Sequence, residues 1–431
     1  MDKLAACTAF LSLLPECRCE ADALSFALSR FGLGYEAVEQ ARADLPKNYD
    51  LEYEGIRVLL SALIEEFVRI PMRADGRARC EVTVPCPTFL IMALQKAAGH
   101  VRFSSDALIA QIVLRSIFLH RQPVDSSCSA KRFCGLNRMR EYLFSEMSAA
   151  DYLLQFGVLC DECTKCHEEN PAVKRVFSVT FPKGNGESVN AYVRRATENF
   201  ISEICSALDI ELTRAHSSQA IKQYAGIVRL ENRLLQLNRR NDRKPMKGNS
   251  FALAQTVLLL VFDDWDKINQ ALETLVREYG SAEPADNIQR KRLYCFYTPF
   301  LYPEIDRLFR ENDVDLIGSA VFLPLQASAG FSLTEMTVAW LHSLSVRAPA
   351  VEQGERIAKE IVASGCCGYL TGMFNFDRWM GPTAMIHTEL LWQIYRIPSW
   401  TVDIDFWLES ATTGAENLKS IIETISEVLS F

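Results

Sequence analysis

The sequence DYLLQFGVLCDECTKC, residues 151–166, decides the fold that we expect for this chain. It begins with an apolar run, which predicts a short strand within residues 151–159. The run ends at Cys160, and Cys163 and Cys166 follow at intervals of three residues. In open parallel sheets, ligands bind beyond the carboxyl ends of the strands, and thiolates are soft ligands that suit iron–sulfur clusters and zinc. The stretch therefore predicts a strand that leads directly into a candidate metal site.

Strands of this kind recur along the chain and alternate with helices. β-Branched and apolar runs predict strands over residues 81–85, 176–181, 293–297, 316–322, 368–373 and 399–402. Helical periodicity predicts helices over residues 88–98, 107–119, 302–312, 352–363, 383–395 and 415–429. This alternation is typical of doubly wound parallel sheets, so the fold class that we expect is α/β.

The alternation occurs in two separate zones, and we therefore expect four parts. Residues 1–75 are predicted to form an N-terminal helical segment, and residues 76–190 a first α/β domain. Residues 191–282 are predicted to form a helical connector, and residues 283–431 a second α/β domain. At 431 residues the chain is longer than one ordinary domain of ~100–200 residues, which agrees with this division.

The helices of the connector carry recognisable end signals. One helix is predicted to start after Ser217 or Ser218, because serine is a favoured N-cap. Asp264 is predicted to cap a further helix, and Gly280 is predicted to end it. In the N-terminal segment, apolar residues recur at helical spacing, while Cys17 and Cys19 stay without an assigned role.

The charge and hydropathy of the chain exclude some partners. The formal net charge is −8, whereas proteins that bind nucleic acid usually present a basic face. A local basic stretch, residues 239–247, is interpreted either as a solvated linker or as a grip on an anionic ligand such as the phosphates of CoA. No apolar run reaches the ~18 residues that cross a bilayer, and residues 1–15 do not form a convincing signal peptide. We therefore expect a cytoplasmic protein without nucleic-acid or membrane partners.

The cysteine content points to metal or redox chemistry. Fourteen cysteines occur in a chain that we expect to stay in a reducing compartment, where disulfides are rare. Cys7, Cys205 and Cys295 lie in apolar periodic segments and are predicted to be core residues. The adjacent pair Cys366 and Cys367 is also predicted to pack in the core.

The cysteines from Cys160 onward leave three interpretations open. Cys160, Cys163 and Cys166 have the spacing with which bacterial ferredoxin motifs begin, and this favours an iron–sulfur cluster. With His167 as a fourth ligand, a zinc site is the alternative, and the third interpretation is that no metal binds. The further cysteines that can complete a coordination shell are Cys80, Cys86, Cys128 and Cys134.

Common phosphate-binding and nucleophile motifs are missing from the sequence. It contains neither a G-x-G-x-x-G turn nor a G-x-x-x-x-G-K-[ST] loop, and it has no G-x-S-x-G elbow. Binding of ATP in a P-loop or of NAD in a standard Rossmann turn is therefore not expected.

Three stretches of the sequence together resemble a known family. The first is residues 150–161, in which a strand ends in Cys160 and Asp161. The second is the connector over residues 199–279, and the third runs from Ile357 through Asp377 to the final helix. In pattern and order these stretches, which cover most of residues 125–431, are similar to the 2-hydroxyacyl-CoA dehydratases, a family that includes benzoyl-CoA reductase subunits.

The resemblance implies a fold, a cofactor and partners. The fold is two flavodoxin-like parallel-sheet domains in an oxygen-sensitive enzyme subunit, which pairs with a homologous second subunit. The cofactor is a [4Fe–4S] cluster, and an ATP-dependent iron–sulfur activator protein delivers single electrons to the enzyme. The implied substrate is an acyl-CoA, which is either dehydrated, as by a lyase, or reduced.

The ligands of the family can be carried over to this chain by position. Cys128 and Cys160 match the first and second ligands. The third ligand falls at Asp377, where the family has a cysteine, so that either Asp377 binds through oxygen or Cys163 or Cys166 supplies the thiolate. Two other hypotheses stay open: a non-catalytic scaffold or electron-transfer subunit of a larger complex, and a zinc-stabilised regulatory protein. A chain that has lost its cluster would only support a partner subunit.

Overall fold

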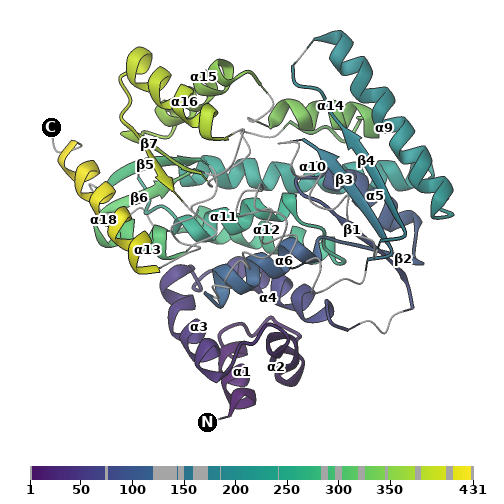
Figure 1. Cartoon of the computed structure of the whole chain (residues 1–431), viewed down its shortest axis with the longest axis horizontal. Coiled ribbons are helices and arrows are strands. Elements are labelled where there is room, and N and C mark those ends of the chain that lie inside the picture. The colour runs from purple at the N-terminus through teal and green to yellow at the C-terminus, as the bar shows by residue number, and fades with distance from the viewer. Residues whose placement is uncertain are drawn as a thin grey trace.

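The computed structural model describes residues 2–72, 76–119, 143, 150–158, 173–184, 186–240, 242–282, 290–296, 303–318, 326–344, 348–373, 380–403 and 411–428. Within these residues the chain forms two four-stranded parallel sheets (Figure 1). The first sheet has the order β2 (Val101–Ser104), β1 (Ala78–Val82), β3 (Tyr152–Gly157), β4 (Arg175–Thr180). The second has the order β6 (Val314–Ile317), β5 (Lys291–Phe296), β7 (Gly368–Met373), β8 (Ser399–Asp403). The expected α/β fold with two flavodoxin-like parallel-sheet domains is confirmed.

Most strands lie where the sequence predicts them, with two differences in the first sheet. β7 matches its predicted range, and β3, β4, β5 and β8 agree to within about two residues. The strand predicted over residues 81–85 instead spans Ala78–Val82, because Pro85 has no backbone N–H to donate to a neighbouring strand. β2 was not predicted, since its four residues are too short to show a periodic pattern. The strand predicted over residues 316–322 begins earlier, at Val314, and residues 319–322 lie outside the described part of the chain.

Helices cover both faces of the second sheet. α15 (Ala350–Ala363) and α16 (Met380–Tyr395) lie above the sheet in Figure 1 and pack on each other. α13 (Pro303–Glu311) and α18 (Ala411–Val428) lie below it and are also in contact. Each helix follows one strand along the chain, as parallel strands require. The four helices predicted in this half are therefore confirmed.

The N-terminal segment is helical, as predicted, and packs on the connector. It contains α1 (Lys3–Leu11), α2 (Ala21–Ser29), α3 (Tyr35–Asn48) and α4 (Glu54–Arg69). α4 buries its apolar side against α12 (Trp265–Ser281). The two helices approach so closely at Gly55 that a Cβ on this residue would lie 2.5 Å from the carbonyl oxygen of Ala271. A glycine is therefore needed at this crossing.

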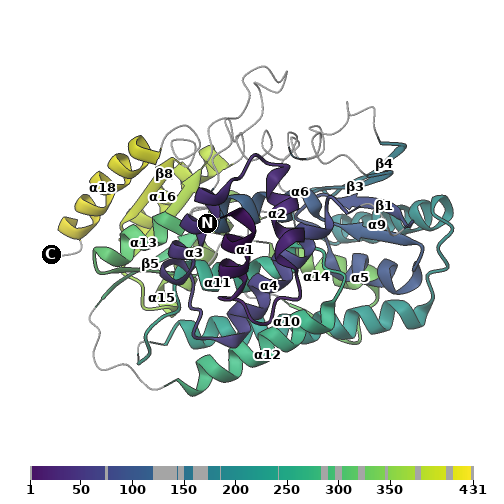
Figure 2. The ribbon, with the colours of Figure 1, turned by 90° about the horizontal axis from the view of Figure 1, so that it is seen from below.

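The connector consists of long helices that pack against the first sheet and the N-terminal segment. α10 (Arg214–Asn238) and α12 run side by side in Figure 2, and α10 also packs on α5 (Thr88–Ala97), the helix after β1. α11 (Gly248–Thr256) contacts α4 and α13, so it lies between the N-terminal segment and the second domain. The boundaries predicted between the four parts stay predictions.

The helix ends of the connector correct two sequence-based expectations. α10 begins at Arg214, not after Ser217 or Ser218, because Thr213 and His216 form a reciprocal capping box. Asp264 is confirmed as the N-cap of α12, since its carboxylate accepts a hydrogen bond from the N–H of Lys267 at 2.9 Å. Gly280 does not end that helix, which continues to Ser281.

One helix from the second half of the chain covers the first half. α14 (Leu333–Ser343) lies between β6 and β7 in sequence, yet it packs on α9 (Glu187–Ala207), the helix that flanks β4. Trp340 of α14 is fully buried, and a hydrogen bond of 3.2 Å joins His342 Nε2 to Asn190 Oδ1 of α9. The helix was not predicted from the sequence. It makes the two halves of the molecule depend on each other.

Candidate functional site

The two sheets place the stretches that contain the candidate ligands at corresponding positions. β3 pairs with the central strand β1, and β7 pairs in the same way with the central strand β5. Cys160 follows the end of β3, and Asp377 follows the end of β7. The expectation that both residues come just after a parallel strand is confirmed. The candidate ligands themselves, Cys128, Cys160, Cys163, Cys166 and Asp377, lie outside the described residues, and their binding of a metal stays a prediction.

The end of β3 that leads toward Cys160 is tightly packed. A Cβ on Gly157 would lie 2.7 Å from Thr180 Oγ1 of the neighbouring strand β4, so only glycine fits. The N–H of Phe156 donates a hydrogen bond of 3.1 Å to Thr83 Oγ1, which ties β3 to the chain just after β1. The N–H of Phe181 donates to the carbonyl oxygen of Gly157 at 3.1 Å. The chain therefore leaves the sheet from a fixed position.

Two cysteines that were considered as additional ligands are buried in the core. Cys80 on β1 and Cys86 before α5 have no exposed surface. Burial raises the pKa of both thiols, which keeps them protonated at neutral pH. A metal takes the thiolate form, which burial of these two thiols disfavours, so their part in a metal site stays a prediction. Among the described residues, no three His, Cys, Asp or Glu side chains come close enough to hold a metal ion.

The remaining core predictions for cysteines hold in part. Cys7 and Cys295 are fully buried, as predicted. Cys205 and Cys366 are only partly buried, and Cys367 is exposed, so the core prediction is wrong for Cys367. Its thiol donates a hydrogen bond of 3.2 Å to the carbonyl oxygen of Arg292. The reason is position, because the pair precedes β7 at the amino end of the sheet rather than inside it.

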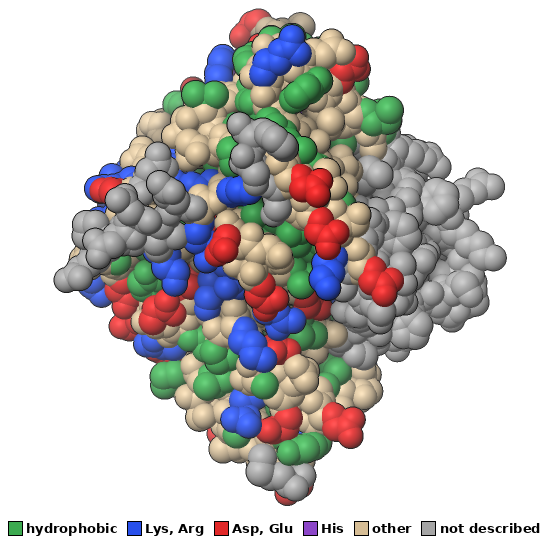
Figure 3. All heavy atoms as spheres, turned by 90° about the vertical axis from the view of Figure 1, so that its left-hand side faces the viewer, with side chains coloured by type: hydrophobic (Ala, Val, Ile, Leu, Met, Phe, Trp, Pro, Cys, Tyr) green, Lys and Arg blue, Asp and Glu red, His purple; other side chains and the backbone are tan. Residues whose placement is uncertain are grey.

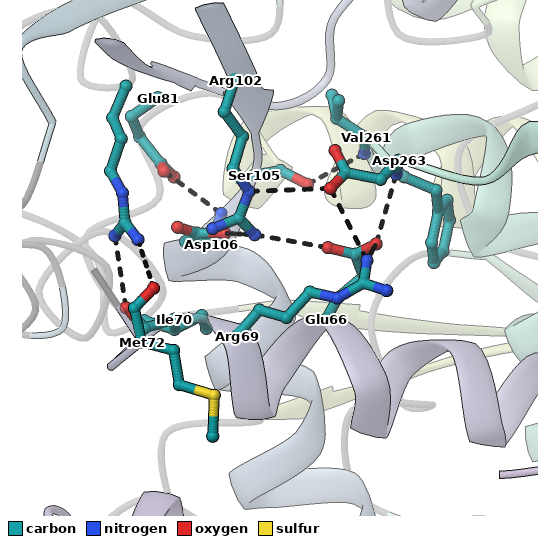
Figure 4. Close-up of polar contacts among 12 residues, drawn as sticks. Glu66, Arg69, Ile70, Met72, Glu81, Arg102, Ser105, Asp106, Val261 and Asp263 are labelled. Carbon is teal, nitrogen blue, oxygen red and sulfur yellow. Dashed lines mark hydrogen bonds and ion pairs between the residues drawn. The ribbon is translucent and has the colours of Figure 1, made fainter. Parts of the chain in front are cut away.

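A buried network of charged side chains lies beside β1 and β2 (Figure 4). The carboxylate of Glu81 accepts hydrogen bonds from the N–H groups of Asp106 at 3.2 Å and of Ala107 at 3.1 Å. These groups begin α6 (Asp106–Ile112). Burial and then the nearby Asp106 raise the pKa of Glu81, although the two N–H groups lower it. Glu81 therefore joins the central strand to the start of the next helix.

Arg102 is the central cation of this network. Its guanidinium lies 3.4 Å from Glu66 of α4, 3.5 Å from Asp106 and 3.9 Å from Asp263, which precedes α12. Burial and then the nearby Asp263 raise the pKa of Glu66 to about 7. Burial also raises the pKa of Asp106. The network thus joins the N-terminal segment, the first sheet and the connector at one place.

Sequence reasoning missed this network because its members are far apart along the chain. Glu66 and Asp263 are separated by most of the first domain and connector, and neither belongs to a motif. A weak signal was present, since Glu66 interrupts the apolar side of α4 and is nevertheless buried. Within the described residues, the network positions the first sheet relative to α4 and the connector.

The basic stretch at residues 239–247 is mostly engaged within the chain. Arg239 forms an ion pair with Glu360 of α15, and Arg243 donates to the carbonyl oxygens of Tyr279 and Gly280 at the end of α12. The ammonium group of Lys247 donates to the carbonyl oxygen of Tyr49 at 2.7 Å. On the face shown in Figure 3, basic and acidic side chains are interspersed. These contacts favour a structural role over a grip on CoA phosphates.

The fold and the position of the candidate ligands define a two-sheet α/β protein with a candidate metal site after equivalent strands. Comparison with protein families identifies it further. The family model for the 2-hydroxyglutaryl-CoA dehydratase D-component matches residues 125–429, which is more than half of the chain. The chain therefore belongs to this family, and the resemblance inferred from the sequence is confirmed. No curated protein matches the chain at a significant level of similarity.

The matched part of the chain includes strands β3 to β8 and all five candidate ligands. It does not include α1 to α4 or the strands β1 and β2, although β1 is central to the first sheet. In the part of the chain that the structure describes, no helix is both long and apolar enough to cross a membrane.

Proposed function

We propose that the chain is an iron–sulfur subunit of a 2-hydroxyacyl-CoA dehydratase-like or benzoyl-CoA reductase-like enzyme. A [4Fe–4S] cluster would be held by Cys128, Cys160 and a third ligand supplied by Cys163, Cys166 or Asp377. The observation that carries the proposal is the family match, which spans both strands, β3 and β7, that lead to candidate ligands.

The donor set of the chain fits such a cluster. Iron–sulfur clusters take thiolates, and residues 128–166 contain five cysteines. The core encloses Cys80 and Cys86, so we expect the thiolates to come first from this stretch. When bound, the cluster would supply low-potential one-electron chemistry to a CoA thioester. The packing around Gly157 and Thr180 would fix the direction in which the chain leaves β3 toward Cys160.

The proposal includes partners. The family is described by one component of a dehydratase, which supports assembly with a homologous second subunit. By family analogy, an ATP-dependent iron–sulfur activator would deliver the electron, and an acyl-CoA would be the substrate. The reaction would be that of a lyase, or of a reductase subunit, in the cytoplasm.

The test is the metal content of the chain purified without oxygen. We expect about four irons with matching acid-labile sulfide in the wild-type chain. Cys160→Ala should lose them, whereas Cys205→Ala, which removes a partly buried thiol from α9, should keep them. Acyl-CoA turnover with an activator would then be measured. Zinc in place of iron, or iron that survives Cys160→Ala, contradicts the proposal.

A second candidate function is a non-catalytic scaffold or electron-transfer subunit. The observation in its favour is that Asp377 stands where the family has a cysteine. A scaffold that has lost its cluster should hold little iron in the wild-type chain and should gain iron in Asp377→Cys. Turnover of an acyl-CoA by the wild-type chain without a homologous partner would contradict it. Zinc that is bound by Cys160, Cys163, Cys166 and His167 would indicate a zinc-stabilised regulatory protein instead.

A further inference from the structure

Cys17 and Cys19 lie on the segment that joins α1 to α2, outside the part of the chain that matches the family. Both side chains are partly buried rather than enclosed in the core. Cys19 lines an open cavity of about 360 Å³, so a small molecule can reach it. The Sγ of Cys17 lies 4.0 Å from the carbonyl oxygen of Ser61 on α4. Cys17 is separated from Cys19 by one residue, and their side chains are near enough to interact, so two partly exposed thiols lie together at this surface.

The segment around the two thiols is fixed on α4. Glu16 forms an ion pair with Arg57 at 2.8 Å. The N–H of Arg18, the residue between the thiols, donates a hydrogen bond of 2.7 Å to Glu65 Oε1. The other oxygen of Glu65 lies 2.7 Å from the ammonium group of Lys267 on α12. Contacts on both sides therefore hold the two cysteines on a rigid support.

The two thiols act on each other and become chemically different. Hydrogen bonding by the side chain and the N–H of Cys19 lowers the pKa of Cys17, against burial and the Glu65 carboxylate, which raise it. The positive charge of Lys267 adds a smaller lowering. The hydrogen bond between the two side chains raises the pKa of Cys19. In contrast, burial raises the pKa of Cys366 and Cys367, although these thiols are also adjacent. A thiolate is the nucleophile in disulfide exchange, so Cys17 is the attacking group.

We propose that Cys17 and Cys19 form a reactive dithiol that small-molecule disulfides oxidise to an internal disulfide. The Cys17 thiolate attacks one sulfur of the small disulfide and releases one thiolate, which leaves a mixed disulfide. Cys19 then loses its proton and attacks Cys17, which releases the second small thiol. One disulfide and two protein thiols thus give one protein disulfide and two small thiols. The proposal does not depend on the cluster at Cys160.

The test is a peptide map of the full chain after treatment with about 1 mM glutathione disulfide, a concentration that drives exchange with exposed thiols. Free thiols are blocked with N-ethylmaleimide in acid before the chain is cut with trypsin. Cleavage at Lys3, Arg18 and Arg30 separates the peptide that carries Cys17 from the one that carries Cys19. The expected result is that these two peptides stay linked and lack two hydrogens.

Three variants separate the proposed pair from its neighbours. Cys7→Ser should keep the link, which shows that the buried Cys7 in the same peptide takes no part. Cys17→Ser and Cys19→Ala should lose it. In Cys19→Ala, Cys17 should form a mixed disulfide with glutathione disulfide at least about tenfold more slowly than in wild type, because the side-chain donor at position 19 is gone. The exchange rate of wild-type Cys17 should exceed that of Cys366 and Cys367 in the same digest. The proposal is overturned if wild-type Cys17 and Cys19 are blocked as completely as before treatment, or if their peptides separate.

Discussion

The two sheets share one plan of strands but differ in the side chains that they bury. Arg79 on β1 and Arg292 on β5 hold equivalent places. Arg79 comes just before the residue of β1 that pairs with the start of β3, and Arg292 comes just before the residue of β5 that pairs with the start of β7. Each arginine donates hydrogen bonds to carbonyl oxygens at the end of a helix. Arg79 reaches Met72 at 2.9 Å after α4, and Arg292 reaches Arg239 at 3.2 Å after α10. The same anchor is therefore built twice.

The difference appears two residues further along each central strand. The first sheet has Glu81 there, which belongs to the charged network, and the second has Tyr294, which is buried among apolar groups. Opposite each arginine anchor the two sheets carry charges of opposite sign, Arg102 in the first sheet and Asp315 in the second. The comparison teaches that a repeated backbone plan tolerates either ionic or aromatic contacts at its centre. It also predicts that the two sheets respond differently to mutation and pH.

The largest expected effect comes from removing the central cation of the network. Arg102→Ala leaves the buried Glu66 and Asp106 without their shared partner, and it should lower the free energy of unfolding by about 3–5 kcal/mol. The matched change in the second sheet, Asp315→Ala, breaks an ion pair of 3.2 Å between the buried Asp315 and the partly exposed Arg290, and should cost less, about 2 kcal/mol. Denaturant unfolding of both variants measures the difference. Equal losses of unfolding free energy in the two variants would contradict the difference between the two sheets.

The next effect is a pH dependence that belongs to the first sheet. The pKa of Glu66 is about 7 in the folded chain and 4.5 for an ordinary glutamate. The folded state therefore holds a proton that the unfolded state has lost, and stability falls as pH rises through this window. The free energy of unfolding of wild type, relative to Glu66→Gln, should fall by up to about 3 kcal/mol between pH 4.5 and 7. Denaturant unfolding across this range measures the trend.

A control from the second sheet should lack this trend. Burial raises the pKa of Tyr294, so this group does not titrate between pH 4.5 and 7. The difference in stability between wild type and Tyr294→Phe should accordingly stay constant over the same range. A pH trend in the control that equals the trend for Glu66→Gln would show that the ionic network is not its source.

A smaller effect is expected from the carboxylate that caps α6. Glu81→Ala leaves the N–H groups of Asp106 and Ala107 buried without an acceptor, which should cost about 2 kcal/mol. Glu81→Gln keeps an acceptor oxygen and should cost less than about 1 kcal/mol. Thermal unfolding of both variants distinguishes the lost hydrogen bonds from the lost charge. A greater loss in Glu81→Gln than in Glu81→Ala would contradict the capping role.

The smallest effect concerns the anchor that the sheets share. Lysine cannot reach several carbonyl oxygens with the planar geometry of arginine, so Arg79→Lys and Arg292→Lys should each cost about 1 kcal/mol. Similar losses in the two variants, measured by thermal unfolding, would support a repeated anchor. A loss at only one of these positions would show that the resemblance between the sheets ends at the backbone.

The strands of the fold were predictable where the apolar pattern is continuous. β7 was predicted with its full range, because Gly368–Met373 is an apolar run that follows a helical pattern. β2 is not predictable from the sequence, because it has four residues and one of them is the charged Arg102. The burial of Arg102 is explained only by partners that are distant along the chain. α14 is not predictable either, because the helix on which it packs, α9, belongs to the other half of the chain. Contacts between distant segments leave little trace in local sequence.

The candidate site, too, is predictable from the sequence only in part. The sequence placed Cys160 and Asp377 after strands, and the structure confirms both strands. It did not show that Cys80 and Cys86 are enclosed by the core, because burial depends on which helices cover the sheet. Nor did it assign a role to Cys17 and Cys19, whose properties depend on Lys267 in another segment.

The packing of α14 on α9 has a consequence for the order in which the protein can be made. The ribosome completes the first sheet when it has synthesised β4, but the helix that covers α9 is not encoded until residues 333–343. A nascent chain that ends before Leu333 therefore exposes the side of α9 that later packs against α14. Since exposed apolar surface during synthesis favours misassembly, the first half reaches its final covered state only after much of the second half has been translated.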